Sequence, residues 1–247
     1  MQITSDEEKY IRYLTAQGDN LYYSAGNVAM AMIQLPSTTV VCTRERWKEL
    51  GRFVLDTEAD RGASIFIRSA TGRGYRTTAV YDLTQTEGRK FQRLQLTDGS
   101  PEMERALTAL LNFSPVQVVT GKDLPTGARY APQAMTLAVA PDLPDSRAFA
   151  AVAAEIAHAR YHDRGWNSGY SRERYELSAQ SVSFILCRRF GIEREAPLAE
   201  RNEGKDAGAR LDFLKGIQDM DRKIGKSVER AIAPPQRAQP ARYGDAR

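Results

Sequence analysis

The stretch Ala153-Ala154-Glu155-Ile156-Ala157-His158 is the part of the sequence that indicates most about the fold of this chain. It lies inside a segment, Ser146 to Tyr161, that is predicted to form a long helix. On such a helix Glu155, His158 and His162 fall at i, i+3 and i+7, so their side chains project to one face. The two histidines are the only ones in the chain. The sequence therefore predicts a helix that presents one carboxylate and two imidazoles together.

This stretch differs by one residue from the zinc-peptidase motif HExxH. In the intact motif, two histidines four residues apart hold a metal ion, and the glutamate between them is the general base for a metal-bound water. Glu155 and His158 are present, but Ala154 stands at the position of the first histidine. A catalytic zinc normally has three protein ligands and one open position. The motif therefore indicates peptidase ancestry before it indicates chemistry.

The regions around the motif helix complete a helix-strand-strand-helix order, which is typical of zincins. We expect a helix at 102–111, a strand at 116–119, a hairpin at 129–139 broken near Pro132-Gln133, and a second long helix at 172–190 that ends at Gly191. Residues 193–208 are polar and resemble a loop. Apolar residues from Leu211 to Val228 recur at spacings of three and four, which predicts an amphipathic helix. Periodicity does not decide whether that helix packs on its own domain or on a partner.

The first hundred residues predict a different, mixed module. Helices are expected at 5–17, 24–34 (well buried) and 44–50, and strands at 38–43, 64–67 and 75–83. The last two strands are joined by the glycine-rich turn Thr71-Gly72-Arg73-Gly74.

Composition places few limits on function. The chain has 247 residues, 42% of them hydrophobic, and a formal net charge of +4. That mild basic excess is compatible with a polyanionic partner. Cys42 and Cys187 form neither a metal-binding pair nor a disulfide framework, which favours buried thiols in a reducing compartment. No stretch of about 18 apolar residues is present, so we expect a cytoplasmic protein without a membrane segment.

Several short strings, in order, resemble the antirestriction protein ArdC family. They are Tyr23-Ser24-Ala25-Gly26-Asn27, Trp47-Lys48-Glu49-Leu50-Gly51-Arg52, Val80-Tyr81-Asp82-Leu83-Thr84-Gln85-Thr86, Glu155-Ile156-Ala157-His158 and Glu176-Leu177-Ser178-Ala179. The resemblance implies an α+β chain with an N-terminal α/β single-stranded-DNA-binding domain at 1–95 and a zincin-like α+β domain with long helices at 101–232. The proline-rich composition of residues 233–247 predicts a disordered tail. The chain departs from the family at Ala154 and at Gln180, where an acidic residue is common.

The resemblance also suggests roles for the motif residues. His158 and Glu176, the first glutamate of the ExxA string, would be the retained metal ligands, and His162 could complete a set of three. Glu155 would be the catalytic base or a substitute ligand. The alternative is that the histidines are ordinary polar residues and that Glu155 pairs with Arg160 or Arg188. Because Ala154 leaves a poor ligand set, we expect no cofactor, with zinc as the alternative, and we expect Ala154→His to create metal binding.

Aromatic rings interleaved with cations in the first module suit single-stranded DNA, whose bases stack on rings and whose phosphates attract cations. The candidate DNA-binding residues are Tyr23, Asn27, Arg44, Arg46, Trp47, Lys48, Arg52, Arg68, Arg73 and Arg76. Trp47 and Tyr23 could instead be core residues. The acidic stretch from Asp56 to Asp60 requires any binding face to be local.

Three functions remain open on the sequence. The chain could be a single-stranded-DNA-binding antirestriction-like protein of a mobile genetic element with an inactive peptidase-like domain. It could be a zinc peptidase with an atypical ligand set. It could also be a non-catalytic protein-interaction module whose 129–139 hairpin offers a strand edge to a peptide partner.

Overall fold

The structure is a computed structural model that describes residues 3, 6–69, 71, 73–163, 169–197 and 206–233. Its N-terminal elements are α1 (Glu7–Asp19), α2 (Ala25–Gln34), β1 (Val41–Cys42), α3 (Arg44–Glu49), β2 (Arg52–Val54), β3 (Ala63–Arg68), β4 (Tyr75–Asp82) and β5 (Thr86–Gly88). They are followed by α4 (Pro101–Asn112), β6 (Gln117–Thr120), β7 (Ala128–Ala131), β8 (Thr136–Val139), α5 (Asp145–Asp163), α6 (Arg172–Arg189) and α7 (Ala207–Ile232). This mixture confirms the predicted α+β class.

The differences from the predicted elements have local causes. The strand expected at 38–43 shortens to β1, because the amide and hydroxyl of Thr39 bond to the Asp82 carboxylate instead of to a strand. The pair β2–β5 was not predicted, since three residues per strand are too few to show alternation. The expectation that α2 is well buried was wrong on one face, where Ile33 is 58% exposed.

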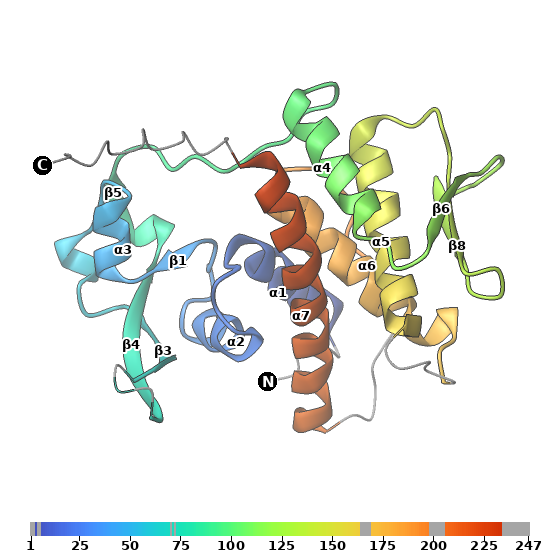
Figure 1. Ribbon diagram of the computed structural model, residues 1–247. Helices are drawn as coiled ribbons and strands as arrows, with labels where there is room; N and C mark the ends of the chain where they lie inside the picture. Colours follow the sequence, from blue (N-terminus) through green and yellow to red (C-terminus); the bar gives the residue numbers. More distant parts are fainter. Residues whose placement is uncertain are drawn as a thin grey trace, which may run out of the picture.

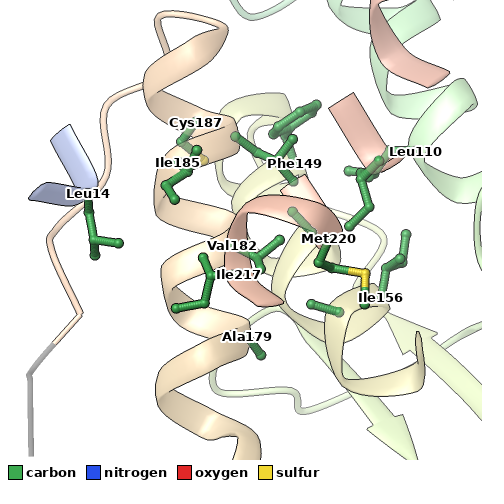
Figure 2. Packing of buried hydrophobic residues seen from close by; sticks show 14 of the residues in the cluster. Leu14, Leu110, Phe149, Ile156, Ala179, Val182, Ile185, Cys187, Ile217 and Met220 are labelled. Atoms are coloured by element: carbon green, nitrogen blue, oxygen red, sulfur yellow. The ribbon is translucent and has the colours of Figure 1, made fainter. Parts of the chain in front are cut away.

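One hydrophobic core joins helices from both ends of the chain. In Figure 1 the other helices lie between β1–β5, which have α3 beside them, and β6–β8. Figure 2 shows side chains of α4, α5, α6 and α7 gathered between the helices, among them Leu110, Phe149, Val182 and Met220. Tyr13 and Leu14 of α1 belong to the same core. The two predicted domains therefore share core packing, and the boundary near residue 95 stays a prediction.

The long helix α7 packs on its own chain. Its buried residues follow the predicted apolar stripe and include Leu214, Ile217 and Ile224. Gln218 adds a polar link to the N-terminal module: its Oε1 accepts from the Ala25 amide at 2.9 Å, and its Nε2 donates to the Tyr23 carbonyl at 2.5 Å. An orphan donor at the start of α2 is thereby satisfied by a residue 193 positions away in sequence.

The N-terminal sheet, ordered β1-β4-β3, has both of its edges covered by amide side chains. At the β1 edge, Asn20 accepts from the Val41 amide at 2.8 Å and donates to the Thr39 carbonyl. At the β3 edge, Asn27 bonds to both backbone groups of Phe66, and Gln34 does the same for Ser64. These amides stand in for neighbouring strands and block further strand pairing at those positions.

Gly191 ends α6 as the sequence predicted. Its φ is +68°, and the amide of Ile192 reaches back to the carbonyl of Cys187 at 2.8 Å. A Cβ at this position would lie 2.7 Å from the carbonyl oxygen of Leu94 and 2.8 Å from Cα of Gln95. The linker between the two halves therefore crosses α6 where only glycine fits.

We expect Gly191→Ala to lower the free energy of unfolding by about 2–3 kcal/mol, since it combines left-handed backbone strain with a backbone clash. Urea denaturation followed by circular dichroism measures this. Gly216→Ala is the control, because it lies within α7 with open space around its Cβ position. That variant should be more stable by up to about 1 kcal/mol. A neutral Gly191→Ala would contradict the close approach of the linker.

The remaining sequence expectations concern the thiols, the membrane and the tail. Cys187 is buried and Cys42 half-buried, and burial raises the pKa of both thiols to about 11. Neither is disulfide-bonded. Among the described residues, no helix is both long and apolar enough to cross a membrane. Residues 234–247 of the expected tail lie outside the described residues, as do 198–205 of the expected loop.

Candidate functional site

Helices α5 and α6 bring the residues of the motif together. Glu155 and His158 lie on α5 and are buried, and Glu176 lies on α6 with its side chain 40% exposed. Nε2 of His158 is 3.2 Å from Oε2 of Glu176. The structure thus places His158 and Glu176 in contact, and their role as metal ligands stays a prediction.

Arg172, in the first turn of α6, sits between the two carboxylates. Its Nη2 donates to Oε2 of Glu155, and its Nη1 donates to Oε2 of Glu176 at 3.0 Å. Glu155 also accepts from the backbone amide of Tyr130 on β7 at 2.7 Å. Gln180 donates to Oε1 of Glu176 at 2.5 Å. Each carboxylate therefore already accepts hydrogen bonds from Arg172 and from one further donor within the chain.

The expected partners of Glu155 were wrong. Arg160, five residues along α5, points elsewhere: it donates to the carbonyl of Phe113 and packs over that ring. Arg188 binds Asp19 of α1 at 2.9 Å. The actual partner, Arg172, is close to Glu155 only because α5 and α6 pack side by side.

The electrostatics follow from these contacts. The hydrogen bond from His158, with help from Gln180 and Arg172, lowers the pKa of Glu176 to about 2 against the opposing effect of burial. Burial acts to lower the pKa of Arg172, but its hydrogen bonds and ion pairs with Glu155 and Glu176 raise it above the ordinary value. Glu176 and Arg172 are thus held as a charged pair at neutral pH.

His162 belongs to an aromatic cluster instead of to the carboxylates. Its Nδ1 lies 2.6 Å from the hydroxyl of Tyr130, and its ring stacks on Tyr170 with centroids 4.7 Å apart. Tyr170 in turn places its hydroxyl 3.2 Å from Nδ1 of His158. Burial raises the pKa of Tyr170 to about 12, so its hydroxyl stays protonated. His162 is therefore not placed to complete the predicted ligand set.

The residues present do not fit a catalytic zinc, which needs three protein ligands and an open position. Ala154 offers only a methyl group, and the imidazole and carboxylates that remain face Arg172, Tyr170 and each other. Across the described ranges, no group of three or more His, Cys, Asp or Glu side chains could hold a metal ion. The two carboxylates do not suit a metal ion, because the guanidinium of Arg172 already bonds to both of them.

Comparisons with known proteins found structural neighbours. Two are crystal structures of the antirestriction protein ArdC from plasmid R388. The metal-free one has a TM-score of 0.42 and 18% identity and covers 85% of this chain and 82% of its own. The Mn(II)-bound one has a TM-score of 0.45 and 18% identity, with 92% and 96% covered. No family model matches the chain, and no curated protein does.

The candidate DNA-binding residues divide into engaged and free side chains. Asn27 covers the β3 edge, and Arg52 donates to Thr86 and to the carbonyl of Arg89. Arg44 packs over the ring of Tyr81, and Arg46 pairs with Glu49 at 2.6 Å. The exposed side chains that make no hydrogen bond or ion pair with another described residue are those of Lys48, Arg68, Arg73 and Arg76.

Trp47 and Tyr23 are core residues, which was the alternative interpretation. Trp47 is 0% exposed, and its indole N–H donates to the carbonyl of Tyr81 at 2.8 Å. Tyr23 is half-buried between the two core clusters that it contacts. The prediction that Trp47 stacks on a base does not fit its burial, because no base can reach the ring.

We therefore expect Trp47→Phe to lower the free energy of unfolding by about 2–3 kcal/mol, because it removes buried volume and the hydrogen bond from the indole N–H to the Tyr81 carbonyl. Binding of single-stranded DNA to the folded variant should be unchanged. Denaturation and fluorescence anisotropy measure the two effects separately. A loss of DNA binding without a loss of stability would contradict the core assignment.

The structure reveals two exposed aromatic residues that the sequence interpretation missed. Phe66 of β3 is 51% exposed and Tyr75 of β4 is 69% exposed. The register pairs Phe66 with Thr77 and Arg68 with Tyr75, so both rings and Arg68 lie on one face of the β3–β4 ribbon. The alternation of apolar and exposed residues along 63–68 is the signal that could have identified this face.

Proposed function

We propose that this chain is a single-stranded-DNA-binding, antirestriction-like protein of a mobile genetic element, in which the peptidase-like helices serve as a non-catalytic scaffold. The observation that carries the proposal is the exposed face of the β3–β4 ribbon. Phe66 and Tyr75 are diagonal neighbours there, roughly 7–8 Å apart by the usual geometry of antiparallel pairs. Two rings at that separation can each stack on one base of a flexible strand.

The charges around the ribbon support the same ligand. Arg68 lies opposite Tyr75 on the same face and Arg73 lies in the turn, whereas Arg76 pairs with Ile67 and therefore projects from the other face. Unpaired guanidinium groups bind phosphate oxygens well and lose no internal ion pair when they do so. The opposite face of the ribbon is covered by α2, through the cluster of Ala31, Ile65 and Val80. Only one face is therefore open to a nucleic acid.

The antirestriction part of the proposal comes from sequence. Five short strings resemble the ArdC family in the family's order, and two of them flank the ribbon at 47–52 and 80–86. The motif residue that departs from the family, Ala154, removes a metal ligand and leaves the N-terminal residues untouched. The proposal therefore keeps DNA binding and omits peptide hydrolysis.

The alternatives have less support. A zinc peptidase needs free metal ligands, and Arg172 bonds to both carboxylates. A peptide partner at the edge of the 129–139 hairpin needs free backbone groups, and the outward amide of Tyr130 is already bonded to Glu155.

The proposal predicts salt-dependent binding of a short oligothymidylate. With three or four phosphate contacts, the logarithm of the association constant should fall with the logarithm of salt concentration with a slope of roughly −2 to −3. Replacing Arg68 and Arg73 by glutamine should reduce that slope by about 1.4. Anisotropy titrations at several salt concentrations measure it, with Arg105→Gln on α4 as the control. Binding that is absent at low salt, or insensitive to salt, would sink the proposal.

A further inference from the structure

The guanidinium of Arg172 lies where two carboxylates from different helices converge. Glu155 reaches it from α5 and Glu176 from α6, and its side chain is only 18% exposed. The Glu155 side chain is 4% exposed. A carboxylate buried to that degree is costly unless a cation and hydrogen bonds compensate for lost water. Within the described residues, Arg172 is the cation that meets this need.

A bound metal and Arg172 would compete for the same oxygen atoms. Metal ligands must present free lone pairs to the ion, whereas Oε2 of Glu155 and Oε2 of Glu176 each accept from Arg172. The planar guanidinium suits this task, because its separate N–H groups can bond to two carboxylates at once. Tyr170, two residues earlier, holds the other nitrogen of His158.

We infer that Arg172 is a built-in counter-cation that replaces the metal ion of a peptidase-like site. The loss of metal binding then has two causes, the missing ligand at Ala154 and the guanidinium between the carboxylates. This inference extends the non-catalytic part of the proposed function and does not depend on DNA binding. It changes the expectation from sequence alone: Ala154→His by itself does not restore a metal site, and removal of Arg172 is also required.

Four proteins test this: the natural chain, Ala154→His, Arg172→Gln and the double variant. Each is stripped with a chelator and titrated with Zn²⁺ alone, and binding is measured by calorimetry and metal analysis. The double variant adds an imidazole at position 154 to His158 and Glu176, and it should bind one equivalent on the order of 100-fold more tightly than Ala154→His. Ala154→His with Arg174→Gln is the matched control. Arg174 is in the same turn of α6 but contacts Gly169 and the ring of Tyr175.

Each outcome of the zinc titrations either supports the role of Arg172 or counts against it. Equal zinc affinity in Ala154→His and the double variant would overturn the role of Arg172, and so would a folded double variant that binds no zinc. Stoichiometric tight zinc in the natural chain would overturn it as well. If the double variant is unfolded after stripping, circular dichroism with added Zn²⁺ decides: recovery of the helical signal supports the inference, and no recovery counts against it. DNA binding of all four proteins tests the proposed function independently.

Discussion

Replacing both Phe66 and Tyr75 with alanine is expected to weaken binding of single-stranded DNA by at least about 30-fold, because each lost base-stacking contact is worth roughly 1–3 kcal/mol. The fold should be unaffected, since both rings are exposed and neither belongs to a core cluster. Anisotropy with a labelled oligothymidylate, at one fixed salt concentration, measures the change.

The control for this prediction is Phe53→Ala. Phe53 is 56% exposed and lies in the same half of the chain, but on β2, which pairs with β5 in a separate sheet. If aromatic stacking is local to the β3–β4 ribbon, Phe53→Ala binds DNA as the natural chain does. Equal losses for both variants would mean that exposed aromatic area matters without a specific face, and no loss in the double variant would remove the main support for the proposed function.

The second large effect concerns Asp221, which is buried on α7. Its Oδ2 lies 3.4 Å from Arg189, which is also bound to Glu229, and its Oδ1 has no hydrogen-bond partner among the described residues. Burial raises the pKa of Asp221 to about 6, although Arg189 acts to lower it. The folded chain therefore binds this proton more tightly than the unfolded chain does.

The stability that Asp221 contributes therefore decreases as the pH rises. A carboxyl whose pKa is raised in the folded state contributes stability that is fully present below its unfolded pKa, near 3.8, and that is lost as pH rises through about 6. The loss amounts to about 3 kcal/mol, since each pKa unit corresponds to about 1.4 kcal/mol. Asp221→Asn does not titrate, so its stability relative to the natural chain should rise by about that amount between pH 4 and pH 7.

Urea denaturation of both proteins across this pH range measures the difference directly. Asp212→Asn is the control, because Asp212 lies on the same helix with its side chain 77% exposed. Its stability relative to the natural chain should hardly depend on pH. Parallel pH profiles for Asp221→Asn and the natural chain would show that Arg189 compensates the buried charge more fully than we infer.

The sequence alone predicted the features that depend on contacts between residues close together in the chain. Ser24, Thr43 and Ser171 cap α2, α3 and α6 through their own side chains, and Gly191 ends α6 at a positive φ. Such contacts join residues a few positions apart, so capping residues and apolar spacing were sufficient to predict the main helices and the β3–β4 ribbon. The position of Ala154 in the stretch that resembles HExxH likewise showed that the first histidine of that motif is absent.

Only the tertiary structure decided which side chains meet. Arg172 on α6 bonds to Glu155 on α5, and Asn27 covers the edge of β3 at Phe66, 39 residues away in sequence. The buried Trp47 donates its indole N–H to the carbonyl of Tyr81. None of these pairs has a fixed spacing in the chain, so no local pattern could reveal them. The sequence by itself determined a long helix that carries Glu155 and His158, with Ala154 at the position of the first histidine of the HExxH motif. The packing of α5 against α6 decided that the guanidinium of Arg172 lies between the carboxylates of Glu155 and Glu176. Buried charges need an opposite charge nearby, and the tertiary structure determines which residue provides it.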